Sequence, residues 1–186
     1  MTAELENNNE LIPPLEKSQI LLISADAGPK SQREVACEAG HFFPGAKWVG
    51  AVRNSSERLG CDFAVLTTGH GMVNSWDIIT PFDKHIDVYP EEVEEKFKNT
   101  ISRFLEGKKY KLGIFYAGGV PRDSYLKILP SIFRSYAVWI LTFGRPNMFD
   151  VGKIDEIVNI LTNGMNTKIY DIRSRLKVPE RLMLLK

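Results

Sequence analysis

The sequence predicts an α/β protein with a mostly parallel central sheet and helices on both faces, in a three-layer, Rossmann-like arrangement. Short apolar runs that are typical of buried strands recur along the 186-residue chain. Amphipathic segments with helical spacing separate these runs. Alternation of strands and helices favours parallel pairing, because each helix returns the chain across one face of the sheet.

The strands are predicted where apolar residues run continuously between turn signals. The first of these runs, residues 20–23, is flanked by polar residues and reads as a central strand. Residues 69–89, by contrast, show no clear period and are expected to form a long ordered loop. The expected strands are residues 20–23, 63–66, 112–116 and 138–141.

Helix start and stop signals fall between and after these strands. Ser31 and Glu34 match a capping box and Gly40 is a stop signal, so a short helix is expected between them. The clearest helix begins at Pro90, where acidic residues fill the first turns and apolar residues follow at helical spacing. Further helices are expected to begin at Pro44, near Pro121 and after Asp150, the last ending at Gly164.

The length and composition predict one folded domain at residues 18–165, with a flexible leader at 1–17 and a basic, apolar tail at 166–186. The formal net charge of +1 does not by itself indicate a partner. Cys37 and Cys61 lie in apolar contexts and are interpreted as buried, reduced thiols. No Cys/His cluster, signal-peptide pattern or apolar run of roughly 20 residues is present, so we expect no metal, no cofactor, no membrane association and a cytoplasmic location.

Unusual turns follow three of the predicted strands, and in a parallel sheet such turns share one edge, where ligands bind. They are residues 24–30, 69–71 and 117–122. The first and third lead toward helix N-termini, whose free N–H groups favour phosphate or carboxylate. Lys30, Arg33 and Arg122 add positive charge. The residues expected to bind an anion or substrate are Asp26, Lys30, Gly71, Gly118, Gly119 and Arg122.

His70 is the strongest candidate for chemistry, because it stands between two glycines at a strand end and an imidazole exchanges protons near neutral pH. Alternatively, it holds the turn by hydrogen bonding to backbone groups. Asp83 could orient His70 or cap a turn, and Ser24 could be a nucleophile, a phosphate-binding hydroxyl or the cap of its own turn. Asp26 could be a base, a ribose ligand or an exposed turn residue, and the glycine pair at 118–119 could serve turn geometry alone. The expected catalytic residues are His70, Asp83 and Ser24.

The order of motifs over roughly residues 20 to 130 resembles the YaaA-like proteins, small α/β proteins that include a domain of unknown function found in bacteria, archaea and phages. The family pattern begins with Ser-Cys and one or two lysines. It continues with Lys-His/Tyr-Gly-Leu and then Pro-Tyr-Asp. The residues that match are Ser24, Lys30, His70, Gly71, Pro81 and Asp83.

Three positions depart from this pattern. Ala25 stands where the family has cysteine, Gly69 replaces the lysine before the histidine, and Phe82 replaces tyrosine. If that cysteine or lysine is catalytic, the activity is lost or altered in this chain. The resemblance implies a link with nucleic acids or nucleobases, through base-modification systems and oxidative DNA stress.

The leading hypothesis is a small enzyme, of hydrolase or glycosyltransferase type, acting on a nucleotide, nucleoside or nucleobase. An acid/base group beside a phosphate pocket suits cleavage or transfer at an N-glycosidic bond. One alternative is a non-catalytic nucleic-acid-binding or stress-response protein, in which the basic tail contacts phosphates. Another is an interaction scaffold, in which the tail builds a homodimer.

Overall fold

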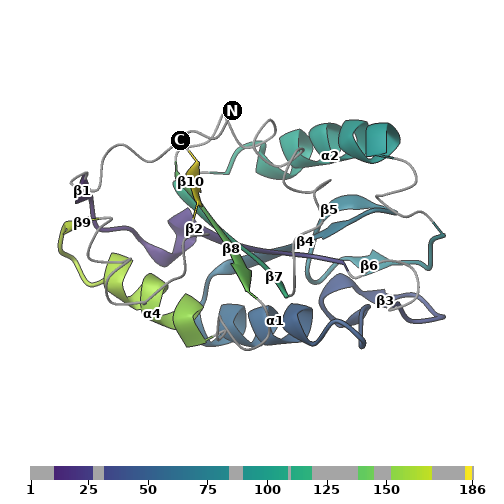
Figure 1. Cartoon of the computed structure of the whole chain (residues 1–186), viewed down its shortest axis with the longest axis horizontal. Coiled ribbons are helices and arrows are strands. Elements are labelled where there is room, and N and C mark those ends of the chain that lie inside the picture. Colours follow the sequence, from purple (N-terminus) through teal and green to yellow (C-terminus); the bar gives the residue numbers. More distant parts are fainter. Residues whose placement is uncertain are drawn as a thin grey trace.

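The described part of the chain forms a mixed α/β fold around one large sheet. The computed structural model describes residues 11–26, 32–83, 90–108, 110–118, 138–144, 152–168 and 183–185 (Figure 1). These residues include a six-stranded sheet in the order β10-β8-β7-β2-β4-β5. Its strands are β2 (Ile20–Ala25), β4 (Asp62–Thr67), β5 (Gly71–Asn74), β7 (Leu112–Gly118), β8 (Val138–Gly144) and β10 (Met183–Leu185).

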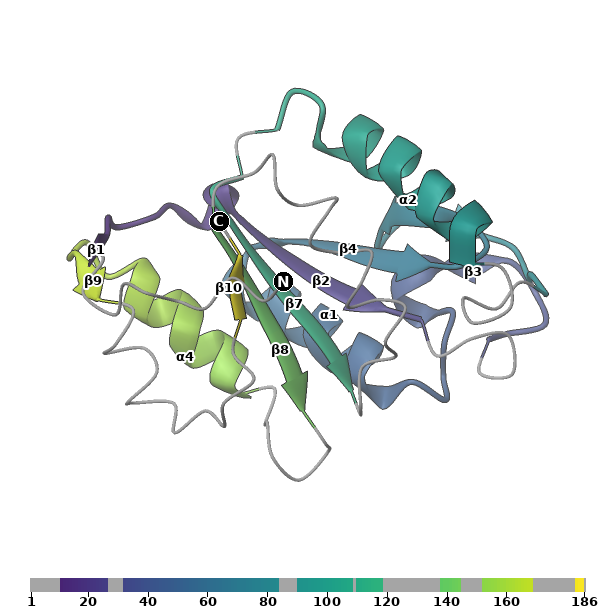
Figure 2. The ribbon, with the colours of Figure 1, turned by 45° about the horizontal axis from the view of Figure 1, so that its top comes forward.

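The four central strands are parallel, which confirms a mostly parallel sheet (Figure 2). The two outer strands run the other way: β5 is antiparallel to β4, and β10 is antiparallel to β8. The sheet is therefore mixed. Every residue of β2 is buried, as expected for a strand covered on both faces.

The strand order reverses at β2, which comes first in the chain among the parallel strands and lies between β4 and β7. In open α/β sheets the point where the order reverses leaves a crevice beyond the carboxyl ends of the two strands concerned. Here these are the ends of β2 and β7, at Ala25 and Gly118. The parallel direction puts the end of β4, at Thr67, on the same edge of the sheet.

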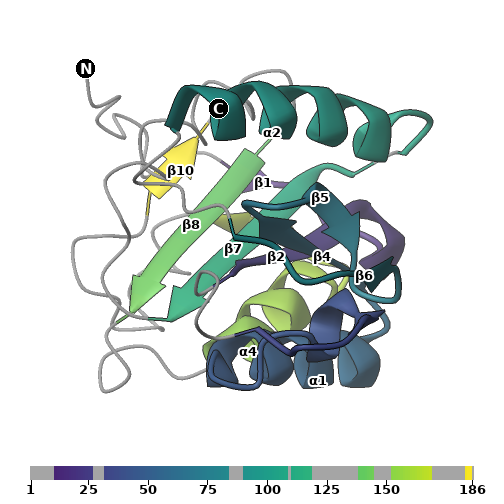
Figure 3. The same ribbon diagram turned by 90° about the vertical axis from the view of Figure 1, so that its right-hand side faces the viewer.

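Helices lie on either side of this sheet (Figures 1 and 3). Helices α1 (Lys47–Leu59) and α4 (Gly152–Leu161) pack together on one side, joined by an ion pair of 2.6 Å between Arg58 and Asp155. Helix α2 (Pro90–Leu105) lies on the other side and contacts β5. Its predicted start at Pro90 is confirmed, and α1 begins three residues after the predicted start at Pro44.

The helix predicted at residues 31–40 is wrong in its described part, residues 32–40. This segment contains β3 (Cys37–Glu38) and a 3-10 turn, η3 (Ala39–His41), and β3 pairs with β6 (Ile78–Ile79). Backbone N–H groups that a helix would use internally, at Ala39 and Gly40, instead donate to carbonyls of the segment that leads into β6. Pairing across the fold therefore overrides the local capping pattern. The expected long loop at 69–89 likewise contains β5 and β6 in its described part.

Strand β5 lies at the edge of the large sheet, and side chains satisfy its outward-facing backbone. The Met72 N–H donates to Thr100 Oγ1 of α2 at 2.9 Å, and the Asn74 N–H donates to Asp77 Oδ2 at 2.9 Å. An edge strand whose N–H groups already have partners offers little template for a further strand. The sheet is therefore closed to extension on this side.

The ends of the chain contribute more structure than the sequence indicated. Within the segment predicted as a leader, β1 (Leu11–Ile12) pairs with β9 (Thr167–Lys168). Leu15 is buried, and its N–H donates a hydrogen bond of 2.8 Å to the Leu161 carbonyl. The buried side chain of Leu15 joins the hydrophobic core, whereas Leu11 is 53% exposed. The 3-10 helix η1 (Lys17–Gln19) then leads into β2. The predicted tail supplies β9 and β10, whereas the helix expected near Pro121 lies outside the described residues.

Candidate functional site

The central feature of the candidate site is the turn between β4 and β5, which carries His70. The hydroxyl of Thr67, the last residue of β4, accepts a hydrogen bond of 2.9 Å from the His70 N–H. The His70 ring reaches the chain after β6, where Nε2 lies 2.8 Å from the Thr80 carbonyl oxygen. Both the backbone and the ring of His70 are therefore held in place.

The Thr80 contact fixes which ring nitrogen carries hydrogen. A carbonyl oxygen only accepts hydrogen bonds, so Nε2 must be the donor. In the neutral imidazole the lone pair then resides on Nδ1, which is the nitrogen able to take up a proton. The ring of His70, a partly buried residue, also meets Phe82 edge to face, with ring centroids 5.7 Å apart. Among the contacts of the described residues, Nε2 is therefore the ring nitrogen engaged by hydrogen bonding.

The glycines beside His70 are explained by packing. A Cβ on Gly69 would lie 2.2 Å from Cγ of the Phe82 ring. A Cβ on Gly71 would lie 2.2 Å from Thr100 Oγ1, and Gly71 also has a φ of +79°, which other residues rarely adopt. The two glycines let the turn approach an aromatic ring on one side and α2 on the other. Gly71 therefore has a structural use, independent of substrate.

A cation reaches this turn from a distant part of the sequence. Lys96, in the middle of α2, donates from Nζ to the Gly69 carbonyl oxygen at 2.7 Å. Gly69 is the position at which the resemblance expects a lysine, and the ammonium group of Lys96 lies against the backbone of that residue. The turn therefore combines an imidazole with a nearby positive charge.

Ser24 lies inside the sheet. It is fully buried on β2, and its Oγ donates to the Tyr116 carbonyl oxygen of β7 at 2.8 Å. This cross-strand hydrogen bond joins the two strands at the point where the strand order reverses. The contact favours a structural role for Ser24 over that of a nucleophile.

Asp26 connects the end of β2 to the His70 turn. The side chain is 9% exposed, and its Oδ2 accepts from the Thr68 N–H at 2.7 Å and from the Thr68 hydroxyl at 3.0 Å. Asp26 is therefore not the exposed turn residue that one interpretation of the sequence allowed. Its carboxylate ties the end of β2 to Thr68, which opens the turn between β4 and β5 at the carboxyl edge of the sheet.

Phe82 and Asp83 have different surroundings. Phe82 is clamped by the side-chain amide of Gln32, which donates to the Phe82 carbonyl at 2.7 Å and accepts from the Phe82 N–H at 3.2 Å. Asp83 is exposed, and the structure gives it no hydrogen bond or ion pair with His70. The predicted pairing of these two residues is thus not seen among the described contacts.

The remaining predicted residues lie at the other turns. Gly118 ends β7, in register with Gly144 of β8. Arg33 is exposed and donates from Nε to the His41 carbonyl at 2.9 Å. Lys30, Gly119 and Arg122 lie outside the described residues, so the predicted anion pocket stays a prediction.

Sequence reasoning missed several residues that shape this edge. Lys96 and Gln32 carry no local motif, and their partners lie 27 and 50 residues away in the chain. Trp48, at the start of α1, donates its indole N–H to the Ala25 carbonyl at the end of β2, at 3.1 Å. A tryptophan near a helix start does indicate a hydrogen bond to a neighbouring segment, because a partly buried indole N–H needs an acceptor.

The thiols and metal-binding residues add no further chemistry to the described part of the chain. The prediction of a buried thiol is confirmed for Cys61, whereas Cys37 is only partly buried. Burial raises the pKa of Cys61 to about 11, and burial also raises the pKa of Cys37. Both shifts disfavour the reactive thiolate. Within the described ranges, no group of three or more His, Cys, Asp or Glu side chains is arranged to hold a metal ion. Nor does any helix in those ranges have the length and apolar character to cross a membrane.

Fold and site together define an α/β protein that holds an oriented histidine at the carboxyl edge of a mostly parallel sheet. Neither the family-model scan nor the searches of curated proteins and solved structures returned a match for the chain. The resemblance to YaaA-like proteins therefore stays a prediction from the motifs.

Proposed function

We propose that this chain is a three-layer, Rossmann-like α/β enzyme that uses His70 as its acid/base group on a nucleotide, nucleoside or nucleobase. The proposed reaction is cleavage or transfer at an N-glycosidic bond. The carboxyl edge of the sheet, where α/β proteins bind ligands, supports this location. The motif order that resembles the YaaA-like proteins supports the substrate class.

One observation carries the proposal: the Nε2 contact of His70 with the Thr80 carbonyl oxygen, at 2.8 Å. This contact leaves the Nδ1 lone pair of the neutral ring for a substrate. Thr67 and Lys96 also bind the backbone of this turn, so the Thr80 contact is not alone in holding it.

The chemistry needs one proton to move from water to the departing base. In hydrolysis the bond between the sugar carbon and the base nitrogen breaks, and the oxygen of a water molecule bonds to that carbon. His70 Nδ1 takes one proton from the water, and that proton then passes to the base nitrogen, which returns His70 to its neutral form. Positioned acid/base groups contribute about 10²–10⁴-fold to such rates. Lys96 lies beside this turn, where its ammonium group favours an anionic substrate.

The variant that tests this mechanism is His70→Gln. The glutamine Nε2 can still donate to the Thr80 carbonyl, but the side chain has no basic nitrogen. His41→Gln is the matched control, because His41 is exposed and its described hydrogen bonds use backbone atoms. Thermal unfolding of both variants checks that the fold is retained.

The assay is chromatographic detection of free base from a panel of nucleosides and nucleoside 5′-monophosphates. We expect the wild-type chain and His41→Gln to release base from at least one member, and His70→Gln to be slower by about 10²–10⁴-fold. Nitrogen-15 NMR of the imidazoles should show His70 as the Nε2–H tautomer. Full activity of folded His70→Gln, no release across the panel, or an Nδ1–H tautomer would contradict the proposal.

A further inference from the structure

A second surface of the molecule carries exposed apolar side chains, on the arm formed by β3 and β6. Trp76 is 50% exposed and Ile78 is 66% exposed. Ile78 is the register partner of Glu38 in this antiparallel pair, so the two side chains share one face of the arm. This face is separate from the His70 turn in its residues and contacts.

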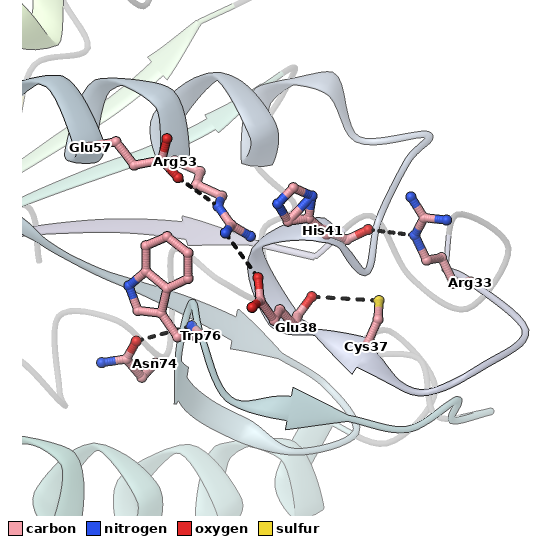
Figure 4. A network of polar contacts seen from close by, with 8 residues as sticks. All are labelled: Arg33, Cys37, Glu38, His41, Arg53, Glu57, Asn74 and Trp76. Atoms are coloured by element: carbon pink, nitrogen blue, oxygen red, sulfur yellow. Dashed lines mark hydrogen bonds and ion pairs between the residues drawn. The ribbon is translucent and has the colours of Figure 1, made fainter.

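The Trp76 indole is held in place from beneath. The guanidinium carbon of Arg53 lies 4.0 Å from the centre of the indole ring. Arg53 is in turn fixed by ion pairs with Glu38 at 2.9 Å and with Glu57 at 3.0 Å, and its side chain is only 7% exposed (Figure 4). The Trp76 backbone N–H also donates to Asn74 Oδ1 at 3.1 Å. One face of the ring is therefore covered while half of the residue remains open to solvent.

The charge around this indole is negative. The carboxylates of Glu38 and Glu57 remain 39% and 47% exposed. Asp77, next in the chain after Trp76, is also exposed, and one of its oxygens, Oδ2, accepts from the Asn74 N–H at 2.9 Å. Against these three carboxylates stands the single guanidinium of Arg53, which leaves a formal charge of −2 for the four groups. Arg33 lies further along, beyond His41, where it is engaged with the His41 carbonyl (Figure 4).

We propose that the exposed Trp76–Ile78 face, with Glu38, Glu57 and Asp77, docks a polypeptide that presents an arginine or lysine beside an apolar residue. A partner's guanidinium would stack on the open face of the indole and hydrogen bond to the exposed carboxylate oxygens. The apolar neighbour would cover Ile78. Tryptophan is among the residues that most often carry binding energy in protein interfaces, especially where its neighbours hold it rigid.

Charge complementarity selects this occupant over nucleic acid. An indole is also a stacking platform for bases, but single-stranded binders pair such platforms with a positive groove that follows the phosphates. Three carboxylates at this face repel phosphate instead. A basic, apolar peptide meets both the charge and the apolar area of the face.

The test uses synthetic pentapeptides and the full chain. Acetyl-Gly-Leu-Arg-Leu-Gly-amide is titrated while the indole N–H signals are followed by NMR, with the Trp76 signal assigned from its absence in Trp76→Phe. Acetyl-Gly-Leu-Glu-Leu-Gly-amide is the charge-reversed peptide, and a ten-residue oligothymidylate represents single-stranded nucleic acid. We expect the arginine peptide alone to shift the Trp76 signal in a saturable way.

Glu38→Gln and Glu57→Gln each keep a side-chain oxygen for Arg53 while removing the negative charge. Each substitution should lower the affinity for the arginine peptide at least three-fold. Glu95→Gln, a substitution of an exposed carboxylate on α2, is the matched control and should leave its affinity unchanged. Raising the salt concentration should weaken binding as well. Equal shifts with both peptides, a larger shift with the oligonucleotide, no saturable shift, or a concentration-dependent Trp76 shift from self-association would overturn the proposal.

Discussion

Replacing Gly71 with alanine should destabilise the fold more than an ordinary glycine substitution, because two separate costs meet at this residue. The first is conformational: Gly71 has a φ of +79°, and a Cβ in the left-handed region costs roughly 1–2 kcal/mol. The second is steric. The added Cβ would lie 2.2 Å from Thr100 Oγ1 and 2.6 Å from Thr100 Cγ2, so α2 or β5 must shift.

The size of the steric cost follows from the packing on either side. Inserting an extra methyl group into a well-packed region typically costs about 1–3 kcal/mol. The Thr100 hydroxyl also accepts from the Met72 N–H at 2.9 Å, a hydrogen bond that a displaced Thr100 would lose. We therefore expect Gly71→Ala to lower the free energy of unfolding by roughly 2–5 kcal/mol, the sum of the conformational and steric costs.

Two further variants separate the costs. Gly60 has a similar φ of +70°, but a Cβ there would meet no atom within 4 Å, so Gly60→Ala should show the conformational cost alone. Combining Gly71→Ala with Thr100→Ala removes the two closest collisions, with Oγ1 and Cγ2, and keeps the φ, while the Cβ of residue 100 stays 2.9 Å away. The two substitutions at 71 and 100 should therefore be coupled, by about 0.5–3 kcal/mol.

The assay is urea unfolding followed by circular dichroism, with all variants compared at a common slope. Equal losses for Gly71→Ala and Gly60→Ala would refute the steric argument. So would additive losses at Gly71 and Thr100, because additivity means that the two residues do not meet.

Three further predictions concern the strand ends and the buried thiol. Ser24→Ala should lower the free energy of unfolding by about 1 kcal/mol, the usual value of a neutral hydrogen bond, and leave any turnover unchanged. A loss of turnover greater than a hundredfold in a folded variant would instead support Ser24 as a nucleophile. Asp26→Ala removes both hydrogen bonds to Thr68, whereas Thr68→Val removes one. Asp26→Ala should therefore lower the free energy of unfolding by about 1–3 kcal/mol more than Thr68→Val does. Equal urea midpoints would contradict a stabilising contact between Asp26 and Thr68. Burial raises the pKa of Cys61 from 9.0 to about 11, so stability from this group is complete below pH 9 and is lost as the pH rises from 9 to about 11. Two pKa units correspond to about 2–3 kcal/mol, and Cys61→Ala should flatten this fall in urea midpoints; an unchanged pH profile would contradict it.

The parts of the fold that the sequence predicted are those in which one short segment determines its own structure. The buried run of β2 and the acidic, periodic start of α2 at Pro90 carry their signals within a few residues. The segment at residues 32–40 does not. Its hydrogen-bond partners lie in the segment that leads into β6, about 35 residues further on, and no local pattern reports them. The two-residue strands β3 and β6 are also too short to show a period.

The candidate site divides in the same way. A glycine-flanked histidine at a strand end was visible in the sequence, because the residue type and the strand end are both local features. Other contacts that fix this turn are not local: Lys96 of α2 binds the Gly69 carbonyl, and Asp26, at the end of a neighbouring strand, binds the Thr68 N–H. The sequence also did not reveal that the Ser24 hydroxyl is buried and donates to a neighbouring strand. Strand alternation alone does not distinguish a buried hydroxyl from one at the carboxyl edge of the sheet.

The proposed docking face and the proposed catalytic turn both involve residues next to β6. Trp76 lies in the turn that leads into β6, and the carbonyl of Thr80, the residue that follows β6, contacts the His70 ring. The arm is therefore shared by the proposed docking face and the proposed catalytic turn. A partner that moved β6 on docking would change the Thr80–His70 contact, and with it the orientation of Nδ1. Coupling of this kind requires β6 to have two arrangements that the partner distinguishes. The imidazole and Trp76 signals, followed in the same peptide titration, would separate a rigid arm from a moving one: a rigid arm shifts only Trp76, whereas a moving arm shifts both.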